Sequence, residues 1–349
     1  MRVLIVKLSA LGDVIHALPV LDYLHQVKPG IEIDWIVEEA FSPLLTGNPK
    51  VAELIVIRAR SWRKHPFAAE TRRELMAAVR RLRDRDYDMV FDIQGNIKSG
   101  VTAWLSGCPD RLGFCREVTQ ESVNTWFTTR QIPLRPGDYH ITDQCLRVAS
   151  IPFGRDFNQL ELATEIPVPD SDERWASRFM ETLGDGLVFL FHCGTTWQTK
   201  FWHEAGWIEL ARLAREVFPG CTIVLTWGNE SERLTADRIA AAAGTCVRVV
   251  ERLPLGKLVG VLKKVDLVVG GDTGIVHAAA AVGTATVSYY RASDAQRSGP
   301  RGSQHKVIQA HMPCARCFRT SCRQDLACRE SITAKELLSA MEMLLKQDR

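Results

Sequence analysis

The sequence has no apolar run that approaches the roughly 20 residues needed to cross a bilayer as a helix. It has little net charge, +3 from 44 basic and 41 acidic residues, so no overall field directs it toward nucleic acid. It also lacks the dinucleotide fingerprint G-x-G-x-x-G and the Walker loop G-x-x-x-x-G-K-[ST]. These absences argue against a membrane-spanning protein, a globally basic nucleic-acid binder and the common nucleotide-binding loops.

What the sequence does have is the composition of a soluble globular protein, with 46% hydrophobic and 24% charged residues. Its 349 residues are too many for one ordinary core, so two domains are expected. Residues 1–21 are apolar enough to imitate a signal peptide, but Lys7 and Asp13 interrupt the run and no clear small-residue cleavage site follows. We therefore expect a buried strand and then a helix there, in a protein kept in the cytoplasm.

Short β-rich apolar runs alternate with helical patterns along both halves of the chain. In the first half we expect helices over 13–26 and 70–83, and strands over 3–6, 32–37, 54–57 and 89–92. Alternation of this kind predicts a parallel sheet covered by helices in each half, an α/β fold. In the second half we expect strands over 187–191, 222–226, 247–250, 267–269 and 285–288, helices from about His203, Glu230, Pro254 and Gly274, and a last helix over 333–345.

The alternation of strand and helix patterns stops between about residues 152 and 185, where prolines and charged residues follow no sustained period. We place the domain boundary there, which gives domains at 1–165 and 166–349, with the last helix able to pack back on the first domain. When two domains of this class face each other, a ligand is expected in the cleft at the carboxyl ends of the strands.

Polar residues gather after several of the predicted strands, where open α/β sheets bind their ligands. Asp13 follows the first strand, although the helix dipole alone also favours an acid at that position. The stretch 92–99 either lines the cleft or caps a helix. Thr195, Thr196 and Lys200 either suit an anionic group or belong to an ordinary surface loop.

The strongest local signal is the turn VVGGDTGIVHAA, which begins at Val268. Free N–H groups where a helix begins form a ready anion site. Close packing explains the glycines and alanines, but Asp272, Thr273 and His277 together at the helix start exceed what packing requires. At another helix start in this half, Glu232 either stabilises the helix dipole or accepts hydrogen bonds from ribose hydroxyls.

A strongly basic stretch lies in the first half. Residues 58–86 contain ten Lys or Arg and four Asp or Glu, which is a net +6 in a chain of +3. We interpret most of this stretch as a solvated helix face. Residues 58–64 are expected to form an Arg-rich loop after a strand, which suits recognition of phosphate or carboxylate groups.

The ten cysteines fall into two groups. Six are scattered and are expected to be reduced core thiols. The other four, with the spacing C-x2-C-x4-C-x5-C, either hold structural zinc or iron or stay free, and we expect them to lie away from the ligand site. The scattered group is Cys108, Cys115, Cys145, Cys193, Cys221 and Cys246, and the clustered group is Cys314, Cys317, Cys322 and Cys328.

Three motifs together resemble the lipopolysaccharide heptosyltransferases of glycosyltransferase family 9. They are KLSALGDVIHALPVL near the start, TTWQTKFWHEAGW in the middle and GGDTGIVHAAAAVGT late in the chain, so the resemblance spans nearly its whole length. Within the family, IDWIVEE, SWRK and WGNESERLTADRIA resemble the heptosyltransferase I type. The segment PCARCFRTSCRQDLAC is more similar to the heptosyltransferase II type.

The resemblance implies a GT-B arrangement of two Rossmann-like domains, the second holding ADP-heptose and the first a Kdo-lipid A acceptor. It implies that Asp13 is the general base of an inverting transfer, and that Arg60, Arg63 and Lys64 meet anionic groups of the acceptor. The donor-binding residues it implies are Thr195, Thr196, Lys200, Glu232, Asp272, Thr273, Gly274 and His277.

One base and a cluster of cationic or dipolar groups supply the chemistry that such a transfer needs. The D-x-D strings at 84–88 and 170–172 are expected in turns, and Lys200 with the helix start at Gly274 would replace a metal ion, so no cofactor is expected for catalysis. Contact with the cytoplasmic face of the inner membrane would be at most peripheral. The alternatives are a II-like enzyme with a heptose acceptor, a metal-binding interaction module built on the clustered cysteines, and an NAD-type oxidoreductase, which the missing fingerprint disfavours.

Overall fold

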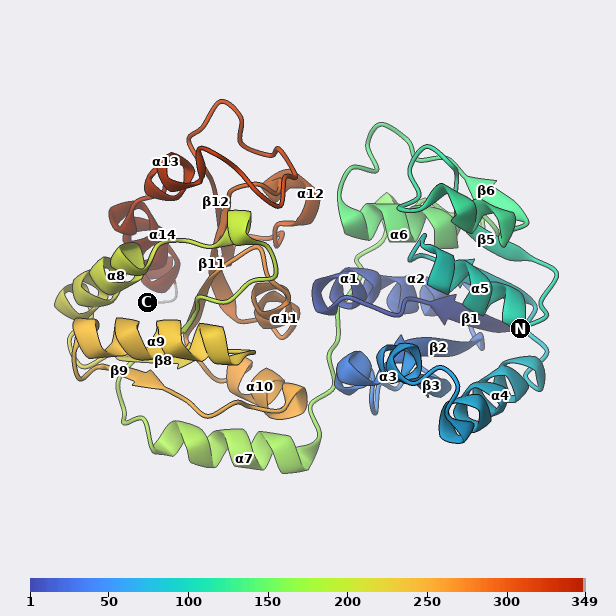
Figure 1. Ribbon diagram of the computed structural model, residues 1–349, viewed down its shortest axis with the longest axis horizontal. Helices are drawn as coiled ribbons and strands as arrows, with labels where there is room; N and C mark the ends of the chain where they lie inside the picture. The colour runs from blue at the N-terminus through green and yellow to red at the C-terminus, as the bar shows by residue number, and fades with distance from the viewer. Residues whose placement is uncertain (348–349) are drawn as a thin grey trace. The chain divides into compact units, whose positions relative to one another are not determined.

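A computed structural model describes residues 1–347 of the chain (Figure 1). The chain separates into two compact units, Met1–Pro167 and Val168–Arg349, so the division lies close to the expected boundary at residue 165. Each unit is built around its own parallel sheet and is described by itself. No helix among the described residues is both long enough and apolar enough to cross a membrane.

The first unit contains a parallel sheet with the strand order β3-β2-β1-β4-β5-β6. Strands β1 to β4 are those that the apolar runs predicted. The sequence analysis missed β5 and β6, because RLGF and RQI are short and carry polar or glycine residues in place of an apolar run. The bounds are β1 Arg2–Val6, β2 Glu32–Glu38, β3 Glu53–Ile57, β4 Met89–Asp92, β5 Arg111–Phe114 and β6 Arg130–Ile132.

Two local predictions in this unit were wrong. The helix expected over 13–26 is two helices, because Pro19 takes the first position of α2, where its missing N–H breaks no bond. The loop expected over 58–64 contains a short helix, α3. The bounds are α1 Leu11–Ala17, α2 Pro19–Val27, α3 Ala59–Lys64, α4 Ala69–Arg83, α5 Ile97–Leu105 and α6 Ile141–Ser150, with 3-10 helices at Glu39–Leu44, Ser122–Trp126 (η2) and Phe157–Gln159.

The second unit repeats the topology of the first. Its strand order, β9-β8-β7-β10-β11-β12, places the strands in the same sequence relation as β3-β2-β1-β4-β5-β6, and every neighbouring pair is parallel. The strand β12, HKVIQ, was not predicted because polar residues interrupt it. The bounds are β7 Val188–His192, β8 Thr222–Thr226, β9 Val247–Val249, β10 Leu267–Gly271, β11 Ala285–Tyr290 and β12 His305–Gln309.

The helices of the second unit correct one further expectation. The stretch 152–185 is not wholly irregular, because α7 forms within it behind Pro169, with acidic residues in its first turn. The buried face of the last helix, α14, packs on α8, β11 and β12 of its own unit. The bounds are α7 Asp170–Glu181, η4 Gln198–Lys200, α8 Glu204–Val217, α9 Glu230–Ala243, α10 Leu255–Leu262, α11 Gly274–Ala281, α12 Ala295–Ser298, α13 Asp325–Glu330 and α14 Ala334–Gln347.

A polar network ties together the strand beginnings of the first sheet. Asp34 of β2 is fully buried, and its carboxylate accepts two hydrogen bonds from Arg85, at 2.7 and 2.9 Å, and one from the Tyr87 hydroxyl at 2.9 Å. Burial and the charge of Asp34 raise the pKa of Tyr87, so its hydroxyl stays a donor. The connection between α4 and β4 is thereby fixed to β2.

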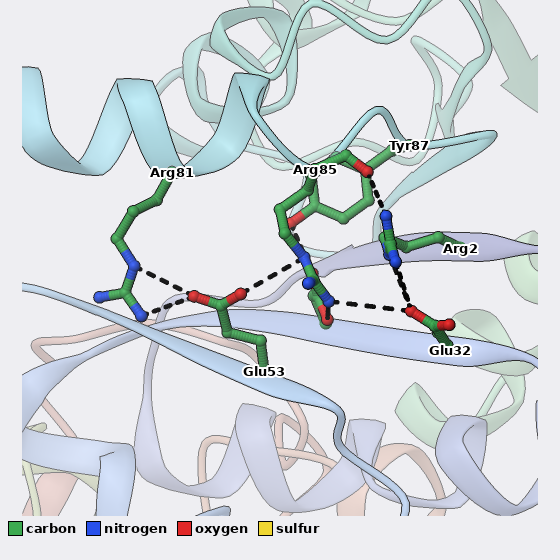
Figure 2. A network of polar contacts seen from close by, with 7 residues as sticks. Arg2, Glu32, Glu53, Arg81, Arg85 and Tyr87 are labelled. Atoms are coloured by element: carbon green, nitrogen blue, oxygen red, sulfur yellow. Dashed lines mark hydrogen bonds and ion pairs between the residues drawn. The ribbon is translucent and has the colours of Figure 1, made fainter.

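The network continues outward over the surface, where Arg81, Glu53, Arg85, Glu32 and Arg2 follow one another across the strands (Figure 2). Arg81 pairs with Glu53 at 2.6 Å, and Arg85 lies 3.3 Å from the other oxygen of Glu53. These outer pairs are partly exposed to water, which weakens them. The stabilising contribution therefore lies mainly with the buried carboxylate of Asp34.

We expect the two arginines to differ strongly in their contribution to stability. The substitution Arg85→Ala leaves the buried carboxylate of Asp34 without its cation, and should lower the free energy of unfolding by about 3–5 kcal/mol. Arg81→Ala removes only an exposed pair and should cost at most about 1 kcal/mol. Urea denaturation followed by circular dichroism measures both. Equal losses for the two variants would contradict this assignment.

Candidate functional site

Each sheet has one point at which its strand order reverses, between β1 and β4 in the first unit and between β7 and β10 in the second. Parallel sheets bind ligands beyond the carboxyl ends of the strands at such points. The four segments concerned are residues 7–13, 92–99, 192–200 and 270–277, each of which the sequence analysis had marked. The topology thus assembles one half-site in each unit.

In the first unit, Asp13 lies in the first turn of α1, and its carboxylate accepts a hydrogen bond from the Ala10 N–H at 3.1 Å. The loop before it is supported from the neighbouring strand, because the side-chain oxygen of Gln94 accepts bonds from the N–H groups of Leu8 and Ser9. Lys7 is buried and donates to the Ile93 carbonyl at 2.9 Å. Asp13 is therefore held at the carboxyl edge of the sheet by a well-bonded loop.

The stretch 92–99 supports this loop from within the protein. Asp92 is fully buried and accepts hydrogen bonds from the Gln94 and Gly95 N–H groups, the Ser99 hydroxyl and the Asn124 amide. Burial nevertheless raises the pKa of Asp92 above its usual value. Of the two interpretations left open for this stretch, the structure favours helix capping, because the Asn96 side chain accepts a hydrogen bond from the Ser99 N–H at the start of α5.

The other basic residues predicted in this unit lie on α3, after β3. Arg60, Arg63 and Lys64 are exposed, and the Arg60 guanidinium lies 5.7 Å from the ring centroid of Phe41. They belong to a helix and not to a loop, but their position beyond a strand end is as expected. They therefore stand at the same edge of the sheet as Asp13.

In the second unit, Asp272 is the centre of a charged network. Its side chain is only 9% exposed, and Lys200 donates to Oδ2 at 2.6 Å. His277 Nε2 donates to Oδ1 at 3.2 Å, and the Ser298 hydroxyl lies 3.4 Å from the same oxygen. Burial by itself would raise the pKa of Asp272, but the bond from His277 and the charge of Lys200 outweigh it and hold the pKa well below its usual value. Asp272 thus stays ionised and fixes both Lys200 and His277 in place.

The network stands at the beginning of α11, whose first residue is Gly274. The Thr273 side chain makes no capping bond to the helix, and its hydroxyl is buried without a partner in the described part of the chain. The preceding glycines are needed for packing, since a Cβ on Gly270 would lie 2.7 Å from Val276 and one on Gly271 would lie 3.0 Å from Tyr289. The first N–H groups of a helix have no acceptor within it, so this end can bind an anion.

The loop after β7 passes beside the start of α9. The Glu232 carboxylate accepts hydrogen bonds from the Gly228 N–H at 2.7 Å and the Asn229 amide at 2.9 Å. A Cβ on Gly194 would lie 2.4 Å from the Glu232 carboxylate, so any other residue there would have to displace that carboxylate. Thr195 is partly buried and Thr196 exposed on the same loop. The structure therefore brings Glu232 next to the loop that carries Thr195, Thr196 and Lys200.

The clustered cysteines correct the sequence analysis. In residues 1–347 all ten cysteines are free thiols, and no three or more His, Cys, Asp or Glu side chains are grouped as metal ligands. Of the two alternatives for Cys314, Cys317, Cys322 and Cys328, a structural metal is therefore unsupported in the described residues. Nor is the segment distant from the predicted donor loop, because the Thr199 hydroxyl donates to the Arg319 carbonyl at 2.5 Å.

Sequence reasoning also missed the residue that anchors this segment. Arg291 is 1% exposed and donates to the Phe201 carbonyl at 2.5 Å and to Asp325 at 2.6 Å, so it joins α13 to the end of the predicted donor loop. Arg291 and Ser298 follow β11, one strand beyond β10. Ligands bind beyond the carboxyl ends of parallel strands, and this rule marked the ends of β7 and β10. Applied also to the end of β11, it would have marked Arg291 and Ser298.

Comparison with known proteins agrees with this architecture. The family model for glycosyltransferase family 9 (heptosyltransferase) matches residues 75–327. The lipopolysaccharide heptosyltransferase 1 of Pseudomonas aeruginosa is 35% identical over 331 residues, which are 92% of this chain and 87% of the relative. The chain belongs to glycosyltransferase family 9. A second family 9 relative, the lipopolysaccharide heptosyltransferase 1 of Escherichia coli K12, is 32% identical over 314 residues, 89% of this chain and 94% of the relative.

A solved family 9 structure extends the agreement to the fold. The Escherichia coli heptosyltransferase WaaC with ADP has a TM-score of 0.79 and 28% identity, and the match covers 99% of this chain and 100% of that one. The prediction of two Rossmann-like units of the GT-B type is confirmed.

His192, which ends β7, should make the stability of this family 9 chain depend on pH. Its ring is buried and lies 3.0 Å from the Thr226 hydroxyl, and burial lowers the pKa of His192 to about 4. Between about pH 4 and pH 6.5 the unfolded chain binds a proton that the folded chain does not. The contribution to stability is therefore complete above about pH 6.5 and falls with decreasing pH, by at most about 1.4 kcal/mol per pH unit.

Urea denaturation at a series of pH values measures this slope. His192→Gln should reduce the slope but not abolish it, because burial also lowers the pKa values of His203 and His305, which still titrate in the variant. His65→Gln, which removes an exposed ring, serves as the control and should keep the full slope. An unchanged slope in His192→Gln would contradict the assignment.

Proposed function

We propose that this protein is an inverting glycosyltransferase that moves L-glycero-D-manno-heptose from ADP-heptose to the Kdo-lipid A inner core in lipopolysaccharide biosynthesis. The observation that carries the proposal is the network of Asp272, Lys200 and His277 at the start of α11. It forms an anion site where a Rossmann-like sheet binds its ligand. The relatives named lipopolysaccharide heptosyltransferase 1, and a WaaC structure with ADP-2-deoxy-2-fluoro heptose at 28% identity, support this choice of donor.

The second unit would hold the donor. Lys200 and the N–H groups at Gly274 would bind the diphosphate, with hydroxyl donors from Thr195, Thr196 and Thr273. These groups stabilise the negative charge that grows on the leaving diphosphate. Asp272 and His277 would act mainly by positioning Lys200 and the helix start, because their mutual bonds hold the network rigid.

Glu232 would bind the ribose of the donor. Its carboxylate already accepts two bonds from the turn at Gly228 and Asn229, which orients it, and a carboxylate has further lone pairs for ribose hydroxyls. A cation and a helix start at the diphosphate supply the charge stabilisation for which other enzymes use a metal ion. We therefore propose that catalysis needs no cofactor.

The first unit would bind the acceptor. Asp13 would take the proton from the acceptor hydroxyl as that oxygen attacks the anomeric carbon from the face opposite the diphosphate. A single displacement of this kind inverts the anomeric centre and needs one base, since ADP is already a good leaving group. Arg60, Arg63 and Lys64 would bind the anionic groups of the acceptor.

A lipid-linked acceptor lies in a membrane, so the protein that modifies it has to reach the membrane surface. We propose a cytoplasmic protein that contacts the cytoplasmic face of the inner membrane peripherally. The second candidate, a II-like enzyme with a heptose acceptor, is kept because the cysteine-rich segment 313–328 is similar to that type. It differs from the first in the acceptor sugar alone.

Incubation with ADP-heptose and Kdo-lipid A, followed by mass spectrometry, tests the proposal. We expect the acceptor to gain one heptosyl unit. Transfer only to an acceptor that already carries heptose would favour the II-like enzyme. Absence of transfer to either acceptor would contradict the proposed function.

In the same assay, Asp13→Asn should lower turnover by at least about a hundredfold, because general base catalysis contributes on that order. ADP binding, measured by calorimetry, should be unchanged, since Asp13 belongs to the first unit and the proposed donor residues to the second. Asp185→Asn, an exposed acid outside both half-sites, is the matched control and should retain full turnover. Near-normal turnover in Asp13→Asn would exclude Asp13 as the base.

A further inference from the structure

The exposed surface of α3 and α4 forms a basic ridge. It is defined by six cationic side chains, all exposed: Arg60, Arg63, Lys64, Arg72, Arg73 and Arg80. In the described part of the chain none of the six is ion-paired with a carboxylate, although the neighbouring Arg58, Arg81 and Arg85 all are. Of the two acids on these helices, Glu74 is already paired with Arg58, which leaves Glu70, so the ridge carries about five unbalanced positive charges.

The ridge is firmly held on the first unit. The Trp62 indole N–H of α3 donates to Glu74 of α4 at 2.7 Å, and Arg58 pairs with the other oxygen of Glu74 at 3.1 Å. The Thr71 hydroxyl donates to the His65 carbonyl at 2.8 Å, which closes the connection between the two helices. Beneath them, Trp62 and Leu82 pack into the core of the sheet. The six charges therefore stand on a fixed surface.

Large apolar side chains project from the same ridge. Phe67, between the two helices, is 99% exposed, and Met76 on α4 is 58% exposed. Met76 lies three or four residues from Arg72, Arg73 and Arg80, so all four share the outer face of the helix. A fully exposed phenylalanine beside unpaired cations is the composition of an interfacial membrane surface, in which basic groups meet anionic headgroups and apolar groups enter the acyl boundary.

We propose that the basic ridge is the surface by which this protein docks on an anionic phospholipid bilayer, with Phe67 and Met76 inserted between the headgroups. Arg60, Arg63 and Lys64 continue the ridge to the edge of the sheet that carries Asp13, so docking would bring a lipid-linked sugar toward that edge. Only the purpose of docking, which is to bring the acceptor to the protein, rests on the proposed function. Binding to a bilayer can be measured without any acceptor.

Co-sedimentation with acceptor-free vesicles tests the proposal. The wild type should bind vesicles of phosphatidylethanolamine and phosphatidylglycerol in equal parts, should not bind pure phosphatidylcholine, and should dissociate as salt is raised. Phe67→Ser should weaken binding about tenfold, because it removes the inserted ring. The double variant Arg72→Gln/Arg73→Gln should weaken it about tenfold or more, because each basic residue near an anionic surface contributes to binding.

Two matched controls make the assignment specific. Trp126→Ser removes another aromatic side chain, 77% exposed, from η2 outside the ridge. Arg174→Gln/Arg178→Gln removes two exposed arginines from α7 in the second unit. Both controls should bind vesicles as the wild type does. No binding of the wild type to anionic vesicles, or equal losses in ridge and control variants, would overturn the proposal.

Two additional measurements distinguish bilayer docking from nucleic-acid binding and from acceptor binding. The first is binding to duplex DNA. If the wild type binds duplex DNA more tightly than the vesicles, and the ridge variants fail to bind it, nucleic acid is the partner and the proposal is overturned.

The second is turnover of a deacylated, soluble Kdo acceptor. With this acceptor, Phe67→Ser should turn over like the wild type. Loss of turnover there would assign Phe67 to acceptor binding instead. Failure of the wild type itself on this acceptor would contradict the proposed function and leave the vesicle result to decide the docking surface.

Discussion

The buried ion pair between Asp272 and Lys200 is the interaction on which the second half-site depends. A carboxylate at 9% exposure is stable as an anion only when cations and hydrogen-bond donors surround it, and here Lys200 and His277 do so from η4 and α11. The pair therefore joins the loop after β7 to the loop after β10, across the point where the strand order reverses. Arg291 and Thr199 extend the same rigidity to the segment that carries the clustered cysteines.

The first half-site is built by the same topology with different bonds. Within residues 1–347, Asp13 receives only a local bond from Ala10, while Gln94 and Asp92 fix the loop before it from the neighbouring strand. A base needs freedom to accept a proton, whereas groups that stabilise a leaving anion need a fixed position. The contrast between the lightly bonded Asp13 and the tightly bonded Asp272 fits that division of roles.

The sequence predicted the architecture well because most strands of both sheets are strongly apolar runs. The strands β1 to β4, and β7, β8, β10 and β11, are such runs, and their ends directed attention to Asp13, Lys200 and Asp272. The strands β5, β6 and β12 were not predicted, because each is short or is interrupted by polar or glycine residues and so forms no apolar run. The division of the 13–26 helix at Pro19 could have been predicted from the proline, whereas α7 was hidden by its many charges.

The contacts within each half-site could not be predicted from the sequence, for a physical reason. A pattern of spacing shows which residues follow strand ends, but it does not show which of them become buried partners. Gln94 was marked as polar, yet its bonds to Leu8 and Ser9 exist only because β4 lies beside β1. In the same way, four closely spaced cysteines suggested a metal site, while the described structure does not bring them together as ligands.

The central claim is that Lys200, fixed by Asp272, binds the diphosphate of the donor. Calorimetric titration of ADP into the wild type and into Lys200→Met tests it most directly, with Lys263→Met, an exposed lysine on the same unit, as the control. The account predicts that Lys200→Met loses at least about tenfold in affinity, which corresponds to about 1.4 kcal/mol, while the control binds like the wild type. Equal affinity of all three proteins for ADP would contradict the account.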